Sequence, residues 1–139
     1  MTAIHSWRRE YIDTMVTPPT DKEFDALISA AMDELPQERI RGLDNVAVTY
    51  DDEPTPYQLE KLKMRGDRLL LGLYEGVPLT KRGTNYSLVL PDKITLFKLP
   101  LARISRDEAD FRQQIKHTLW HEIAHFYGLD HDDIRAREK

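Results

Sequence analysis

The chain contains no cysteine, which excludes disulfide bonds and cysteine-ligated zinc sites. Any metal must therefore be held by His, Asp or Glu side chains. A basic excess is also missing, since the formal net charge is −4. This charge argues against a nucleic-acid-binding protein, because such proteins usually carry a clustered basic face.

Long apolar runs are absent as well, and none approaches the roughly 18 residues of a membrane helix. The N-terminal stretch MTAIHSWRREYIDTMV lacks the apolar core of a secretory signal. We therefore expect a cytoplasmic protein that does not bind membranes. The length of 139 residues, with 40% hydrophobic and 32% charged residues, favours one globular domain.

Residues 1–20 are predicted to form an N-terminal extension, because they end in TPPT, whose two prolines interrupt regular structure. Residues 21–139 are predicted to form the domain. It begins with an amphipathic helix, since Thr20 and Glu23 have the spacing of a capping box. Apolar residues then recur every three or four positions, as on a helix face packed against a core. They are Phe24, Leu27, Ile28, Ala31 and Leu35.

Short apolar segments in the middle of the chain predict a small mixed sheet. They are NVAVTYDDEP, RLLLGLYEGVPLT and YSLVLPDKITLFKLPL. Pro91 interrupts the third segment, which predicts one or two strands, including one from Ile94 to Leu99. We expect the strand over Ile94–Leu99 at the rim of the sheet, where an extended substrate would pair with it. The polar stretch from Pro54 to Arg68 predicts a loop or a short irregular helix.

The longest helical pattern lies near the C-terminus and is predicted to end at Gly128. Ser105 and Glu108 have the spacing of a capping box at its start, and Gly128 suits the left-handed position after a helix. The fold class is therefore α+β, with an N-terminal helix, a small mixed sheet and a long C-terminal helix.

This helix carries the motif that predicts chemistry. His121 and His125 are four residues apart, which is about 400° of helix, so both imidazoles project from one face. Two histidines at this spacing can bind one tetrahedral zinc ion. Glu122 is rotated by about 100° and flanks the metal, where its carboxylate can take a proton from a zinc-activated water.

Beyond the helix, His131 follows Gly128 by three residues and is the predicted third ligand. Three protein ligands leave the fourth zinc position open, as catalytic sites require. Neighbouring carboxylates remain alternatives that would replace, assist or close this site: Asp130, Asp132 and Asp133. His117, one turn before His121, is expected to support the site or the core rather than to bind the metal.

The complete pattern H-E-x-x-H-x-x-G-x-x-H is far more specific than its first half. H-E-x-x-H arises by chance in roughly one such chain in a hundred, and the full pattern in roughly a few per hundred thousand. The interpretation as a zinc site therefore rests on the full pattern and on its place at the end of the predicted helix.

The chain resembles the small bacterial zincin-like, matrix-metalloprotease-like family of metallopeptidases. The resemblance runs from about Phe24 to Ile134. It includes ALISAAMDELP, LDNVAVTYDDEP, LLLGLYEGVPLT, LPDKITLFKLPL and HTLWHEIAHFYGLD. It implies a minimal zincin-like fold whose C-terminal helix is the active-site helix, with Zn²⁺ on His121, His125 and residue 131, and with Glu122 as general base and acid.

Two departures qualify the resemblance. Position 131 is often Asp in that family, whereas this chain has His131, as metzincins do. Metzincins continue into a methionine turn, but this chain has eight residues after His131 and no later Met. The motif also resembles that of bacterial ribosomal-RNA maturation metalloproteins, which typically carry Gly where this chain has Glu122.

These observations predict a zinc-dependent metallopeptidase that acts on a peptide or protein substrate. The alternatives are a metal-dependent RNA-processing hydrolase, which Glu122 and the acidic balance disfavour, and a non-catalytic zinc-stabilised interaction module. Tyr127, Tyr86 and the arginines are candidates for stabilising the oxyanion. Substrate and oligomeric state do not follow from the sequence.

Overall fold

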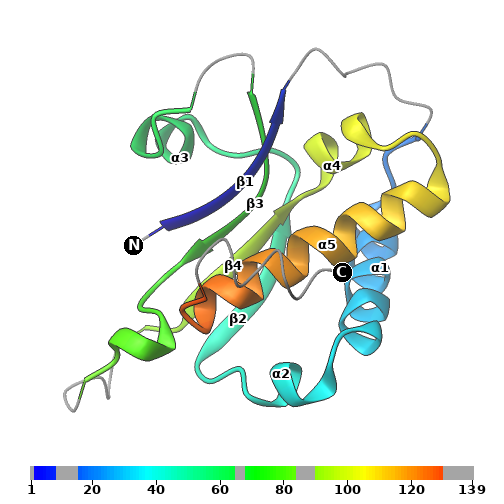
Figure 1. Cartoon of the computed structure of the whole chain (residues 1–139). Helices are drawn as coiled ribbons and strands as arrows, with labels where there is room; N and C mark the ends of the chain where they lie inside the picture. The colour runs from blue at the N-terminus through cyan, green and yellow to red at the C-terminus, as the bar shows by residue number, and fades with distance from the viewer. Residues whose placement is uncertain (1, 9–15, 65–67, 84–89, 130–139) are drawn as a thin grey trace.

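The computed structural model describes residues 2–8, 16–64, 68–83 and 90–129, and for residues 2–8 it describes the backbone (Figure 1). The elements are β1 (Thr2–Arg8), α1 (Asp21–Glu34), α2 (Gln37–Arg41), β2 (Val46–Asp51), α3 (Pro56–Lys61), β3 (Arg68–Glu75), the 3-10 helix η2 (Leu79–Lys81), β4 (Asp92–Phe97), α4 (Lys98–Ile104) and α5 (Glu108–Phe126). This arrangement confirms the predicted α+β class.

The strands form one mixed sheet in the order β1-β3-β4-β2. The strands β2 and β4 pair in parallel, whereas β1–β3 and β3–β4 are antiparallel. Helix α5 crosses one face of the sheet with α1 packed beside it, and α3 lies against the other face (Figure 1). The main core is therefore enclosed between α1, α5 and the sheet.

Local sequence explains the first helix and the buried strand. Thr20 and Glu23 form the predicted capping box, with each side chain bonded to the other's backbone N–H. In β3 every residue from 69 to 74 is buried, as expected for a strand covered on both faces. The extension predicted over residues 1–20 contributes β1, which pairs with β3 at the edge of the sheet.

The stretch from Pro54 to Arg68, predicted as a loop or short helix, contains α3. Thr55 and Gln58 cap this helix reciprocally, and Pro56 occupies its first turn, where a missing N–H costs nothing.

Two predictions about β4 are wrong. The strand ends at Phe97 rather than Leu99, because the chain continues directly into α4, whose first turn tolerates Pro100. The strand is also not at the rim of the sheet, since it lies between β3 and β2 and pairs with both. No free edge remains on β4 along these paired residues for an extended substrate.

The predicted capping box at the start of α5 is also wrong. The cap is Asp107, whose carboxylate accepts a hydrogen bond from the Asp110 N–H at 2.8 Å. Ser105 instead ends α4, and its hydroxyl donates to the Leu101 carbonyl at 2.7 Å. The carboxylate at 107 caps the helix because it sits one residue before the first helical turn.

Candidate metal site on helix α5

Helix α5 brings the two predicted histidine ligands together. The Nε2 atoms of His121 and His125 are 3.2 Å apart, and the ring planes meet at 65°. Two nitrogens bound to one tetrahedral zinc ion at 2.0–2.1 Å would be about 3.3 Å apart. Both side chains are half-buried, so the pair lies at the boundary between the core and the surface. The geometry of the pair therefore fits two ligands of one zinc ion.

The third ligand falls beyond the part of the chain that the structure describes. His131 lies outside the described residues, as do the alternatives Asp130, Asp132 and Asp133. Within the described residues, no three His, Asp or Glu side chains are grouped as a metal site. The assignment of His131 as a zinc ligand therefore stays a prediction.

Glu122 points from the same helix into the interior. Its side chain is 0% exposed, and neither carboxylate oxygen accepts a hydrogen bond of normal geometry from the described residues. Burial raises the pKa of Glu122 well above its ordinary value, and the nearby backbone N–H of Tyr74 opposes this effect more weakly. A buried carboxyl group without a partner is uncommon unless it serves a function, and a cation beside it would supply one.

The close approach of α5 to the sheet depends on Gly72, a residue that was not among the predicted site residues. A Cβ atom on Gly72 would lie 2.6 Å from the Thr118 Cγ2 and 3.4 Å from the Glu122 Cγ. A glycine inside an otherwise apolar strand is the sequence sign of such an approach. Gly72 thus lets Glu122 sit directly on β3.

An irregularity in β3 turns Gly72 toward α5. His5 pairs with Gly72 and Ser6 with Leu70, so Leu71 is an extra residue in the ladder. Leu69 and Leu71 pack in the core under α5, whereas Leu70 and Leu73 pack in the cluster under α3. The extra residue shifts the alternation of β3, which places consecutive residues, Leu71 and Gly72, on the α5 side.

Comparison with known families agrees with this geometry. The family model described as zincin-like metallopeptidase matches residues 43–139, which include β3 and all of α5. The chain belongs to the zincin-like metallopeptidases. No curated protein matches the sequence of this chain.

In the part of the chain that the structure describes, every helix is too short or too polar to cross a lipid bilayer.

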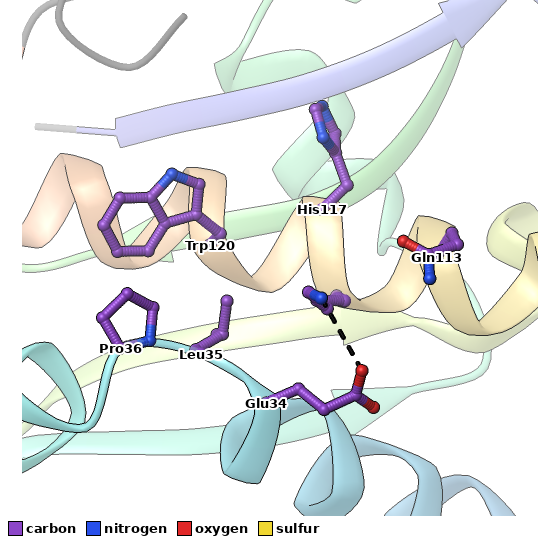
Figure 2. Close-up of a pocket in the computed structure, with 7 residues that line it drawn as sticks. Glu34, Leu35, Pro36, Gln113, His117 and Trp120 are labelled. Atoms are coloured by element: carbon purple, nitrogen blue, oxygen red, sulfur yellow. Dashed lines mark ion pairs between the residues drawn. The ribbon is translucent and has the colours of Figure 1, made fainter. Parts of the chain in front are cut away.

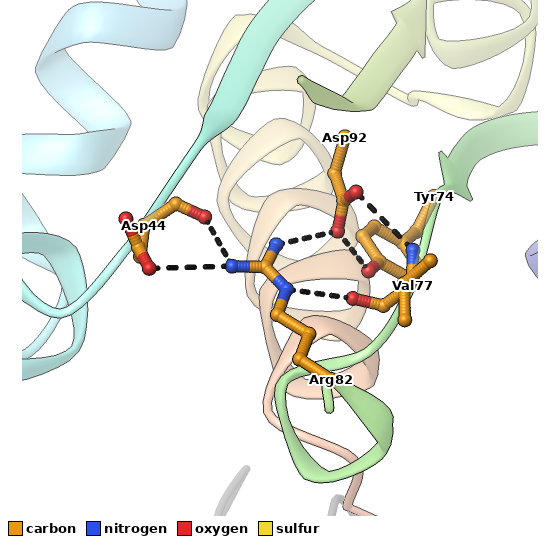
Figure 3. A network of polar contacts seen from close by, with 5 residues as sticks. All are labelled: Asp44, Tyr74, Val77, Arg82 and Asp92. Atoms are coloured by element: carbon orange, nitrogen blue, oxygen red, sulfur yellow. Dashed lines mark hydrogen bonds and ion pairs between the residues drawn. The ribbon is translucent and has the colours of Figure 1, made fainter. Parts of the chain in front are cut away.

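A buried ionic network supports the loop that follows β3 in this zincin (Figure 3). Arg82 bonds the Asp92 carboxylate at 2.8 Å, the Asp44 carbonyl at 2.8 Å and the Val77 carbonyl at 3.0 Å. The Tyr74 hydroxyl donates to the same carboxylate at 2.5 Å. The guanidinium also lies 5.0 Å from the ring centre of Phe126, the last residue of α5. The network therefore ties this loop to the end of the histidine-bearing helix.

The end of α5 confirms the predicted left-handed glycine. Gly128 has φ +78°, and a Cβ atom there would lie 2.4 Å from the Thr80 Oγ1, so η2 packs against the turn that leads toward His131. Tyr127, a predicted oxyanion candidate, donates its hydroxyl to the Arg39 carbonyl at 2.5 Å. The hydroxyl proton of Tyr127 is therefore donated to α2 rather than directed toward the histidine pair. Tyr86, the other tyrosine candidate, lies outside the described residues.

A cavity of about 280 Å³ lies between the end of α1 and one face of α5 (Figure 2). Leu35, Pro36 and Trp120 form its apolar wall, and His117 and Lys116 lie on its polar side. His117 is exposed here, so the expectation that it packs in a polar core is wrong. Because it lies one turn from His121 without joining the converging pair, it offers a matched control for metal binding.

Proposed function

We propose that this protein is a zinc-dependent metallopeptidase that hydrolyses peptide bonds. In this proposal His121, His125 and His131 hold the zinc ion, and Glu122 is the general base. The observation that carries it is the convergence of two imidazole nitrogens at 3.2 Å, next in sequence to a buried carboxyl group that accepts no hydrogen bond of normal geometry from the described residues. Membership of the zincin-like metallopeptidases supports the same chemistry.

The histidines would hold a zinc ion, which would supply Lewis acidity that lowers the pKa of water to about 7 and polarises the substrate carbonyl. Glu122 accepts a proton from the attacking water and returns it to the leaving amine. The water oxygen ends on the carbonyl carbon while the C–N bond breaks. Glu122 packs on Gly72, which holds its side chain against β3. The carboxylate is therefore held in place by packing, unlike that of an exposed glutamate.

Metal content tests the ligands first. Protein purified without added metal should contain about one zinc per chain by mass spectrometry. His125→Ala should lose the zinc, whereas His117→Ala should keep it, because His117 lies on the same helix outside the converging pair. Equal zinc in both variants, or none in the unchanged protein after zinc is added back, would refute the assignment.

Hydrolysis of an unfolded protein tests the catalytic role. Glu122→Gln should retain zinc but lose about 10²–10⁴-fold of the rate, since general-base catalysis contributes an effect of that size. Zinc retained without hydrolysis by any form of the protein would favour a non-catalytic, zinc-stabilised module instead.

A further inference from the structure

Strand β3 has one edge on which a peptide could pair. Its inner edge is bonded to β4, and its outer edge is bonded to β1, from Thr2 opposite Glu75 to Arg8 opposite Arg68. The backbone groups on a sheet edge are a template for an extended peptide, which adds as a further strand. Whether the outer edge of β3 accepts another chain therefore depends on β1.

This outer edge lies at the candidate metal site. His5 of β1 pairs with Gly72, and a Cβ atom on Gly72 would lie 3.4 Å from the Glu122 Cγ. Helix α5 contacts both β1 and β3, and β1 runs alongside β3 as the end strand of the sheet (Figure 1). A peptide that replaced β1 in this register would pass one strand spacing, about 4.8 Å, from Gly72. Its backbone would thus lie beside Glu122.

The burial of Glu122 means that part of the protein must move before this carboxylate can reach a substrate. A general base must come within hydrogen-bonding reach of the group whose proton it takes, yet Glu122 is 0% exposed. The inner edge of β3 belongs to the central ladder with β4, whose residues are buried in the core. Displacing β1, by contrast, disturbs an edge strand of the described sheet, which pairs with β3 and not with β4.

An irregularity weakens the hold of β1 on β3. The register shifts between His5 and Ser6, which interrupts the ladder in its middle. Separately, the part of the chain that matches the zincin-like family begins at residue 43, so β1 lies outside the matched part.

We propose that β1 is an autoinhibitory strand that occupies the substrate-binding edge of β3. An extended segment of a polypeptide substrate replaces β1 on this edge, antiparallel to β3, and so reaches Glu122. The inference rests on the proposed peptidase function for its catalytic consequence, but the exchange of strands can be measured without catalysis.

A reversible lock on β1 tests the exchange in the full chain. Paired residues of antiparallel strands have Cα atoms about 4.5–5.5 Å apart, which suits a disulfide. The chain has no cysteine, so Arg8→Cys with Arg68→Cys creates a single possible intramolecular pair. The probe is a fluorescein-labelled peptide of sequence TAIHSWR, identical to β1, and its binding is followed by fluorescence anisotropy. Arg8→Ser with Arg68→Ser is the matched control, which removes the same charges but forms no bond.

The reduced double-cysteine protein should bind the peptide. Oxidation should weaken binding by about tenfold or more, because the disulfide then holds β1 on the edge of β3 at a higher effective concentration than in the reduced protein. The serine control should bind equally under both conditions. Equal affinity of the reduced and oxidised proteins, or no binding by either, overturns the inference.

Hydrolysis of unfolded casein by the same proteins separates the two proposals. Slower hydrolysis in the oxidised state supports both of them. Binding that switches with oxidation, without hydrolysis in either state, keeps the strand exchange and removes the peptidase function. Hydrolysis at equal rates in both states keeps the peptidase and overturns autoinhibition by β1.

Discussion

Replacing Gly72 with Ala should destabilise the fold at the place where α5 meets the sheet. The added methyl group would lie 2.6 Å from the Thr118 Cγ2, far inside van der Waals contact, and 3.3 Å from the Leu96 Cδ2. Thr118 is fully buried, and its branched side chain has little rotamer freedom in a helix. The helix or the strand must therefore shift to admit the methyl group.

The expected cost follows from two opposing effects. Overpacking a core by one methyl group typically costs about 1–3 kcal/mol. Gly72 does not have the positive φ of Gly76 or Gly128, so Ala brings no backbone strain there. Ala also restricts the unfolded chain, which offsets about 0.4–1 kcal/mol. We expect Gly72→Ala to lower the free energy of unfolding by about 1–2 kcal/mol.

Urea denaturation of a double-mutant cycle isolates this clash. Thr118→Ser removes the Cγ2 methyl that the new Cβ would strike, and by itself should cost about 1 kcal/mol for the lost buried methyl. The double variant should be more stable than the sum of the two changes predicts, by about 1 kcal/mol or more. Additive effects, or no loss of stability in Gly72→Ala, would refute the close approach of α5 to β3 at this residue.

Further predictions concern two charged contacts. Asp92→Ala should lower the free energy of unfolding by about 3 kcal/mol in urea, because it removes the buried carboxylate paired with the guanidinium of Arg82, whose side chain is 6% exposed, and leaves the exposed Asp44 carboxylate at 3.4 Å. Arg103→Ala, which breaks a more exposed pair, should change it by less than about 1 kcal/mol, and equal losses would contradict the network. Lys98→Met should cost about 0.5–1 kcal/mol at pH 8, a small value because the Asp21 carboxylate is largely exposed. The hydrogen bond to Asp21 raises the pKa of Lys98 above 10.5, so this stabilisation is complete below 10.5 and disappears as the pH rises through the raised value. A difference between the two proteins that persists unchanged well above that value in urea titrations would contradict the ionic origin.

Local patterns in the sequence determined helices α1 and α5, the apolar segments that form β2, β3 and β4, and the pairing of the two histidines. Each depends on residues close together in the chain: Thr20 caps α1 through Glu23, and one helical turn brings His121 beside His125. The same local logic selected the wrong cap for α5, because Ser105 and Asp107 both precede its first turn and only the backbone path distinguishes them.

Tertiary structure decided which strand forms the edge of the sheet beside the site. Strand order depends on pairing between distant segments, so β4 became central and β1 took an edge position beside β3. The same holds for Gly72, which lies against Glu122 although the two residues are 50 positions apart in the sequence. Periodicity reports which face of an element is apolar, but it carries no information about the partner that covers that face.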